Sequence, residues 1–323
     1  MSISRRNLFA LSAGLASVAV LPGSPGALSA VPPAATPVPG VIRRKVGKIE
    51  VTALLDGYME MPATLFKAPE EEAARLAREQ FQPPSPRSSP VNAYLINLGD
   101  RLVLIDTGAA DLFGPTLGKL SQALAAVGVK PEQIDAVLLT HMHPDHVGGA
   151  IDPHGKAVYS NAELIVSEAD FRYWHDEGAL SQAPAAFKPF FSGARAVAKA
   201  YQKRLTQFSD ETEVFGELRT VPLPGHTPGH TGVMVRSGDD ALFIWADIVH
   251  HAAFQFAHPE WGPAFDVDGN QAAASRKRAF DQAAYDRILL AGMHMPFPGF
   301  GHIASENGSY RFVAAEWPYA LQL

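Results

Sequence analysis

Apolar and polar positions alternate along the chain in short blocks that predict strands and helices. The stretch NAYLINLGDRLVLIDTG predicts two strands joined by a turn at Gly99-Asp100. Apolar residues at 117, 120, 124 and 127 have helical spacing, and Gly128 is expected to end that helix. The run IDAVLLT at 134–140 has four consecutive apolar residues at its centre, as is typical of a strand buried on both faces.

The remaining blocks continue this mixture of short strands and helices. Strands and helices in clusters predict two sheets with helices packed outside them, in one domain. The expected segments, in chain order, are two short strands around Asp56-Gly57, a helix and then a loop within 66–90, a strand running into a helix at 162–174, a helix at 193–207, a strand and then a hairpin turned at 238–240, a helix at 270–286, and strands near 287–292 and 309–313.

The N-terminus has the layout of a cleavable export signal. Arg5-Arg6 precedes a modestly apolar, Ala- and Gly-rich run, which suggests the bacterial twin-arginine route and a periplasmic or secreted protein. An uncleaved anchor or a basic tail is the alternative. We expect residues 1–30 to be the signal, 31–41 a Pro/Ala-rich linker, and 42–323 the folded domain, with no stable membrane insertion once the signal is removed.

Composition narrows the possible partners. The 323 residues are 47% hydrophobic and 19% charged, which is ordinary for a globular protein. The net charge of -6, without any basic run, argues against a nucleic-acid partner. Cysteine is absent, so neither disulfides nor thiolate metal ligands are available. Exposed apolar residues near the N-terminal loop would allow a homodimer.

The segment LLTHMHPDHVGGA at 138–150 carries the chemistry. His141, His143, Asp145 and His146 follow a buried strand, and imidazole and carboxylate groups suit zinc, manganese, iron or cobalt. A surface loop with accidental histidines is improbable for four such residues together. Three further candidates follow later apolar strands: His226, Asp247 and His294. These seven residues are enough for two metal ions.

The motifs HMHPDH, GHTPGH, AD after a strand and GMH resemble those of the metallo-β-lactamase superfamily. Further stretches, including LIDTGAADLFGPTLGKL and HMPFPGFGHI, are similar to methyl parathion hydrolase and its esterase and lactonase relatives. The resemblance covers most of the chain after the linker. It implies an α/β fold, the αββα four-layer sandwich of two mixed sheets with helices on both outer faces. It also implies that His141, His143 and His226 hold one metal, that Asp145, His146 and His294 hold the other, and that Asp247 bridges them.

Two divalent cations about 3.5–4 Å apart can share a hydroxide and supply it near neutral pH. We expect two zinc ions, with manganese, iron or cobalt as alternatives, and catalytic roles for Asp247, Asp145 and His250. Outer hydrogen bonds are expected from Asp106, Thr140 and His230, each of which could equally be a structural residue. An aromatic rim could bind the substrate, although each aromatic residue could instead pack in the core. Its candidates are Phe113, Trp174, Phe190, Phe191 and Phe256.

The expected activity is hydrolysis of small lactones, including acyl-homoserine lactones, or of aryl esters. His250 stands where the organophosphate-hydrolysing pattern of the relatives would have an apolar residue, so phosphotriester hydrolysis is the second hypothesis. A β-lactamase and an iron-binding redox protein rank below these two. A metal-free interaction domain is the remaining alternative, and it would give none of the seven candidate ligands a function.

Overall fold

The computed structural model describes residues 33–34, 37–83 and 85–321. The export signal expected at 1–30 lies outside the described residues. Residues Pro39–Leu323 group into one compact unit, which contains every helix and strand discussed below.

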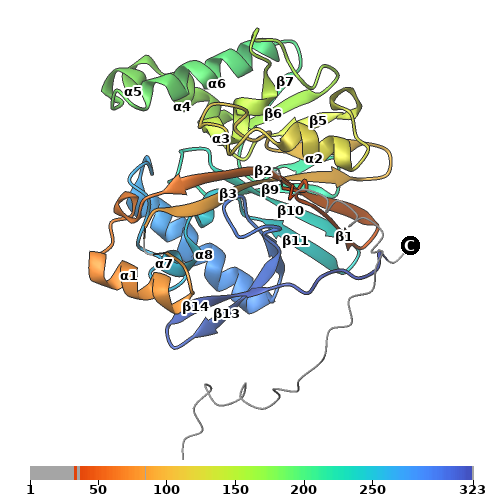
Figure 1. Cartoon of the computed structure of the whole chain (residues 1–323). Helices are drawn as coiled ribbons and strands as arrows, with labels where there is room; N and C mark the ends of the chain where they lie inside the picture. The colour runs from red at the N-terminus through yellow and green to blue at the C-terminus, as the bar shows by residue number, and fades with distance from the viewer. Residues whose placement is uncertain (1–32, 35–36, 84, 322–323) are drawn as a thin grey trace, which may run out of the picture. The chain divides into compact units, whose positions relative to one another are not determined.

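Two seven-stranded sheets build this unit (Figure 1). In the first sheet β4 to β7 are parallel and the others antiparallel, and in the second only β11 and β12 are parallel, so both sheets are mixed. The first sheet has the order β1 (Val41–Val46), β2 (Ile49–Met61), β3 (Arg87–Asn97), β4 (Leu102–Ile105), β5 (Ala136–Leu138), β6 (Glu163–Ser167), β7 (Leu205–Phe208). The second has the order β14 (Ser309–Ala314), β13 (Gly301–Glu306), β12 (Leu289–Ala291), β11 (Asp240–Ile244), β10 (Thr231–Ser237), β9 (Leu218–Pro222), β8 (Glu213–Val214).

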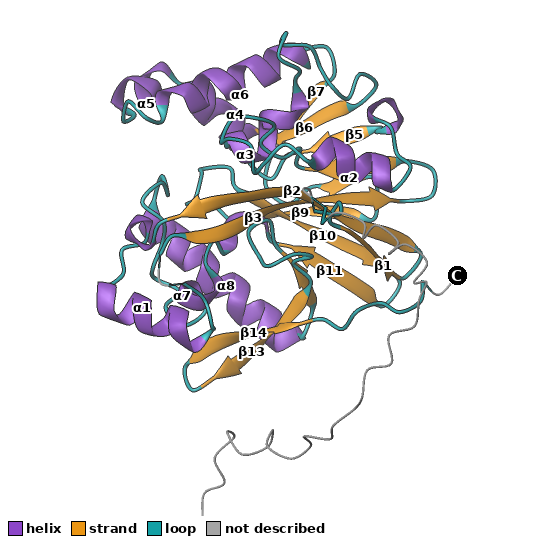
Figure 2. Ribbon diagram, viewed as in Figure 1, coloured by secondary structure: helices purple, strands orange, loops and turns teal. Residues whose placement is uncertain are grey.

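Helices cover the outer faces of the two sheets (Figure 2). One apolar core lies between the sheets, a second lies under α2, α4 and α6, and a third lies under α8. The predicted four-layer αββα sandwich is therefore confirmed. The helices are α1 (Glu70–Glu79), α2 (Leu120–Ala126), α3 (Pro144–Val147), α4 (Glu168–His175), α5 (Glu177–Gln182), α6 (Lys188–Ala200), α7 (Ala252–Gln255) and α8 (Gly269–Asp286), with short 3-10 turns η2 (Ala63–Leu65), η3 (Pro131–Gln133), η4 (Gly148–Ala150) and η5 (Ala246–Ile248).

The two short strands expected around Asp56-Gly57 are instead the single strand β2, so this prediction was wrong. The register shifts between Leu55 and Gly57, which marks a bulge rather than a turn. The buried Asp56 carboxylate accepts backbone N–H groups of Ala109, Gly118 and Leu120 at 3.0, 3.2 and 2.9 Å. Asp56 therefore anchors the loop after β4.

The helix expected at 193–207 is displaced. α6 begins at Lys188, with Pro189 in its first turn, and ends at Ala200. Residues Leu205–Phe208 form β7, which pairs in parallel with β6. Pairing with the sheet edge prevails over a weak local helical preference. The strands β1 and β13 were also missed by the sequence analysis.

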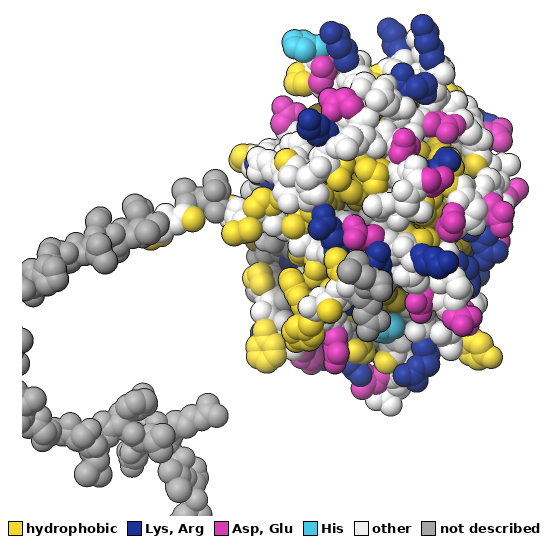
Figure 3. Space-filling view, turned by 90° about the vertical axis from the view of Figure 1, so that its right-hand side faces the viewer, with side chains coloured by type: hydrophobic (Ala, Val, Ile, Leu, Met, Phe, Trp, Pro, Cys, Tyr) yellow, Lys and Arg dark blue, Asp and Glu magenta, His cyan; other side chains and the backbone are white. Residues whose placement is uncertain are grey.

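The described surface is mixed in charge. On the face shown in Figure 3, lysine and arginine side chains are interspersed with aspartate and glutamate. Among the described residues, no helix is long and apolar enough to cross a membrane. The homodimer stays a prediction.

Candidate metal centre

All seven predicted ligands lie in connections that follow strands. His141 and His143 lie in the loop between β5 and α3, and Asp145 and His146 lie in α3 itself. His226 follows β9, Asp247 lies in η5 directly after β11, and His294 follows β12. Because β11 and β12 are parallel, their carboxyl ends lie at one edge of the second sheet. The chain therefore delivers ligands from both sheets to one place.

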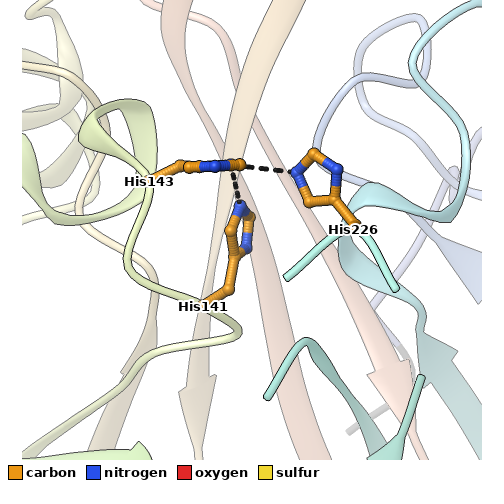
Figure 4. A group of neighbouring side chains, drawn as sticks. All are labelled: His141, His143 and His226. Carbon is orange, nitrogen blue, oxygen red and sulfur yellow. Dashed lines mark hydrogen bonds between the residues drawn. The ribbon is translucent and has the colours of Figure 1, made fainter. Parts of the chain in front are cut away.

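Three imidazoles meet at the first position, as Figure 4 shows. The Nδ1 atom of His143 lies 3.0 Å from Nε2 of His141 and 2.9 Å from Nε2 of His226. All three residues are buried. The hydrogen bonds around them show which of these nitrogens carry protons.

Thr140 fixes the tautomer of His141. Its hydroxyl donates its one proton to Asp106 Oδ2 at 2.7 Å, so at 3.1 Å it accepts from Nδ1–H of His141. His226 donates Nδ1–H to Asp266 Oδ1 at 2.7 Å. The Nε2 atoms of His141 and His226 then both direct lone pairs at Nδ1 of His143. That nitrogen carries at most one proton, so it can donate to only one of them. The arrangement lacks donors, and a cation among the three lone pairs fits it.

Asp247 is the centre of the second group. Its Oδ2 atom lies 3.1 Å from His294 Nε2, 3.2 Å from His146 Nε2 and 3.7 Å from His141 Nε2. Asp145 Oδ2 lies 3.5 Å from His146 Nε2 and 3.4 Å from His294 Nε2. Ligand atoms of Asp145, His146 and His294 all lie within 4.8 Å of one another, and so do those of His141, His146 and Asp247.

Several buried polar atoms in this group have no hydrogen-bond partner among the described residues. They include His146 Nε2, Asp247 Oδ1 and both ring nitrogens of His250. Unpaired buried polar atoms are costly, and metal coordination would satisfy those of the ligands. The donor set of imidazole and carboxylate suits divalent transition metals, so the residues present fit two such ions.

Outer hydrogen bonds hold the ligands in place. Asp106 accepts Nδ1–H of His146 at 2.7 Å and the backbone N–H of Thr140 at 2.8 Å. His230 donates Nδ1–H to the Leu223 carbonyl at 2.9 Å, and its Nε2 accepts the backbone N–H of Asp247 at 3.0 Å. The structure thus places all three residues expected to give outer support directly against predicted ligands.

Burial and charge divide the imidazoles into two classes. Burial lowers the pKa of His141, His143 and His226 well below its ordinary value, and neighbouring imidazoles lower it further. These three imidazoles are therefore neutral. For His146 and His294 burial also acts downward, but the Asp247 and Asp145 carboxylates outweigh it and raise the pKa. Without a cation, a proton would take its place between these imidazoles and carboxylates.

An apolar cavity of about 800 Å³ lies next to the segment that carries His143 and Asp145, although none of the seven predicted ligands lines it. Pro144, between His143 and Asp145 in sequence, lines the cavity, and so do Phe113 and Phe190. The Phe190 ring lies 6.0 Å from that of His143 and 6.3 Å from that of Phe113. These two members of the expected aromatic rim therefore lie where a substrate could reach them.

The other three aromatic residues are buried. Trp174 packs 5.4 Å from the His143 ring and 4.8 Å from Phe191. Phe256 belongs to the core under α8 and stacks on Phe280 at 5.1 Å. The structure places Phe191 and Phe256 in core packing rather than on the cavity wall.

His250 lies inside the cluster. Its Nε2 is 3.2 Å from Asp247 Oδ2, its ring stacks on His294 at 5.0 Å, and it is buried. Burial lowers its pKa, so it is neutral. His226, Asp247 and His250 also form a possible ligand group.

Sequence reasoning missed two acids that support the cluster. Asp266 accepts Nδ1–H of His226, and Asp170 accepts backbone N–H groups from two of the ligand loops. Asp170 lies three residues after β6, as His294 does after β12, so its place after a strand was an available signal, although it belongs to no motif. Asp266 lies in the connection between α7 and α8 and has no such local signal.

Comparisons with known proteins agree with this geometry. The family model of the metallo-beta-lactamase superfamily matches residues 87–294. The uncharacterized protein YobT of Bacillus subtilis (strain 168) is 29% identical over 185 residues, which cover 54% of this chain and 71% of YobT. The N-acyl homoserine lactonase AttM of Rhizobium radiobacter is 28% identical over 142 residues, which cover 40% of this chain and 47% of AttM. The matched part thus spans about half the length of that lactonase.

Two solved structures are similar over nearly their whole length. The hydrolase AbOPH of the beta lactamase superfamily has 32% identity and a TM-score of 0.82, covering 87% of this chain and 99% of AbOPH. AidC, described as a dizinc quorum-quenching lactonase, has 26% identity and a TM-score of 0.82, covering 86% of this chain and 98% of AidC.

Proposed function

Because the chain belongs to the metallo-beta-lactamase superfamily and is a metal-dependent hydrolase, we propose that it opens lactone rings or cleaves aryl esters. The observation that carries this proposal is the meeting of unpaired imidazole and carboxylate atoms beside an apolar cavity. Lactonases among the relatives support the lactone as the first substrate class, acyl-homoserine lactones included.

Two metal ions would be shared among the seven ligands. His141, His143 and His226 would hold one, Asp145, His146 and His294 the other, and Asp247 would contact both. Two divalent cations there would lower the pKa of water enough to supply hydroxide near neutral pH and would polarise the ester carbonyl. Zinc is the first choice, because AidC is a dizinc enzyme.

The chain's own residues would bind and orient the substrate. The apolar cavity with Phe113 and Phe190 would take the acyl chain or aryl group and exclude water from it. Neutral His250 carries one ring N–H, and neither of its ring nitrogens completes a hydrogen bond among the described residues, although Nε2 lies 3.2 Å from Asp247 Oδ2. The ring would donate this N–H to the carbonyl or ring oxygen of the substrate. Asp145 and Asp247 would hold their negative charge against the cations.

A hydrolysis panel tests the proposal. Metal-reconstituted protein is assayed with acyl-homoserine lactones, γ-lactones, aryl esters and phosphotriesters, before and after chelation. We expect lactone or aryl-ester turnover that chelation abolishes and zinc restores. Protein without stoichiometric transition metal that stays equally active after exhaustive chelation would overturn the proposal. Turnover confined to phosphotriesters would instead favour the methyl parathion hydrolase type.

The role of His250 has its own comparison. In His250→Leu the N–H donor is lost while the bulk remains. We expect lactone hydrolysis to fall at least tenfold and phosphotriester hydrolysis to be retained or to rise. Unchanged lactone turnover would exclude the role.

We also propose export to the periplasm or beyond, on the strength of Arg5-Arg6 and the apolar run that follows. Cell fractionation with wild type and an Arg5→Lys, Arg6→Lys variant tests it. Retention of the variant in the cytoplasm is expected, and equal distribution of both forms would refute the proposal.

A further inference from the structure

Asp170 is a fully buried carboxylate in the first turn of α4, outside the predicted ligand set. No Lys, Arg or His of the described residues forms an ion pair with it. A charge buried in this way is expensive unless hydrogen bonds compensate it. Its neighbours show what compensates it.

Three N–H groups converge on the Asp170 carboxylate. Oδ2 accepts the backbone N–H of Met142 at 2.7 Å and the indole N–H of Trp174 at 3.0 Å. Oδ1 accepts the backbone N–H of Gly229 at 3.1 Å. All three hydrogen bonds come from N–H donors, so both oxygens of the carboxylate are used as acceptors.

The two backbone donors belong to different ligand loops. Met142 lies between His141 and His143, whereas Gly229 lies in the loop between β9 and β10 that contains His226. One carboxylate therefore ties the loop after β5 in the first sheet to the loop after β9 in the second. The same two loops bring the imidazole nitrogens of His143 and His226 to 2.9 Å from each other.

The loop between β9 and β10 packs tightly against the first turn of α4. A Cβ added to Gly229 would lie 2.3 Å from the Asp170 backbone nitrogen, so only glycine allows this contact. The third donor also leads to a ligand, because the Trp174 ring that Asp170 holds packs 5.4 Å from the His143 ring. Another link between the two regions is the backbone hydrogen bond from Thr231 N–H to the Thr140 carbonyl at 2.9 Å.

We infer that Asp170 is a positioning residue that sets the spacing of the His141, His143 and His226 imidazoles by clamping their two loops together. It touches no predicted ligand atom and acts through Met142, Trp174 and Gly229. The inference rests on the proposed metal centre and is independent of which ester or lactone is hydrolysed.

The test measures metal affinity of the apoprotein rather than turnover. In Asp170→Asn the shape is kept, but the amide NH2 must face at least one of the three N–H donors. We expect the zinc affinity, measured by chelator competition, to fall about 10- to 100-fold at the first of two sites and little at the second. The visible spectrum of the Co²⁺-loaded protein should change accordingly.

Asp56→Asn is the matched control. Asp56 is also a buried carboxylate that accepts three backbone N–H groups, but from the β4–α2 loop and the first residue of α2, which carry no predicted ligand. Apo Asp56→Asn should lose thermal stability as Asp170→Asn does, while its zinc affinity stays within about threefold of wild type. If Asp170→Asn does not fold, Trp174→Phe removes one donor and should weaken the first zinc site about three- to tenfold.

The outcomes separate the possible failures. Wild-type affinity in Asp170→Asn, or in Trp174→Phe where the first variant is unfolded, overturns the inference. Equal losses of affinity in Asp170→Asn and Asp56→Asn also overturn it, because the effect would then be general destabilisation. A wild-type apoprotein that binds no zinc would overturn the proposed centre itself.

Discussion

Gly193 offers a substitution that should raise stability and narrow substrate range at once. It lies within α6 and lines the apolar cavity, and a Cβ added there meets no atom within 4 Å. Glycine inside a helix costs ~1 kcal/mol relative to alanine. Gly193→Leu should therefore stabilise α6 while projecting its side chain into the space proposed for the substrate.

The loss of activity can be estimated from the atoms excluded. Leucine adds three heavy atoms beyond alanine, so we expect it to exclude about three methylene groups of a long acyl chain from the cavity. Each buried methylene contributes ~0.8 kcal/mol, which gives about 2.4 kcal/mol in all. At about 1.4 kcal/mol per factor of ten, kcat/KM for a decanoyl substrate should fall roughly 50-fold.

The assay compares butanoyl and decanoyl homoserine lactones in wild type, Gly193→Ala and Gly193→Leu. Both variants should have a raised melting temperature, because both gain helix propensity. Only Gly193→Leu should lose activity on the decanoyl substrate, and the butanoyl substrate should be turned over about equally by all three. A Gly193→Leu enzyme that is stabilised yet hydrolyses both substrates like wild type would refute the assignment of this cavity.

The remaining predictions concern the cluster and its supports. Asp247→Ala should abolish most turnover and lower bound metal below two per chain, and full metal content with unchanged activity would contradict the assignment. Asp266→Asn replaces the charged acceptor of His226 by a neutral one, so zinc affinity should fall about 10-fold by chelator competition, with circular dichroism as the check on folding. Gly225→Ala places a Cβ 2.0 Å from the Ala272 nitrogen at a φ of +127°, so thermal unfolding should show a melting temperature lower by several degrees, whereas an unchanged value would mean that this contact relaxes freely.

The four layers could be predicted because the apolar pattern is local. The continuous apolar run before His141 is β5, and the helix expected at 270–286 is α8 within one residue. Asp56-Gly57 was misread because a turn and a bulge have the same composition. What distinguishes them is a loop more than fifty residues away, whose N–H groups bind the Asp56 side chain.

For the site, too, local sequence patterns could be interpreted, whereas contacts between distant residues could not. The ligands could be predicted because each stands within eight residues of the end of an apolar strand, four of them in the single motif HMHPDH. The aromatic rim could be predicted only in part, because Phe190 and Phe256 have similar sequence surroundings yet one lines the cavity and the other packs under α8. Asp170 and Asp266 belong to no motif, and each has another acid two residues away, Glu168 and Asp268, so the sequence does not single them out. They gain a role only through tertiary contact.

The acids of this site fall into two kinds that depend on each other. Asp106 and Asp170 have both oxygens facing protein donors, and Asp266 has Oδ1 facing His226 while its Oδ2 has no partner among the described residues. These hydrogen bonds fix where the imidazoles point. Asp247 is buried, and its Oδ1 has no donor within the part of the chain that the structure describes. An unpaired buried carboxylate oxygen destabilises the fold. The supporting acids must therefore make the site rigid enough to keep this oxygen in place for a metal ion to bind. The rigid hydrogen bonds around the site and the unpaired polar atoms at its centre therefore belong together. The fold keeps these atoms unpaired, and cation binding would pair them.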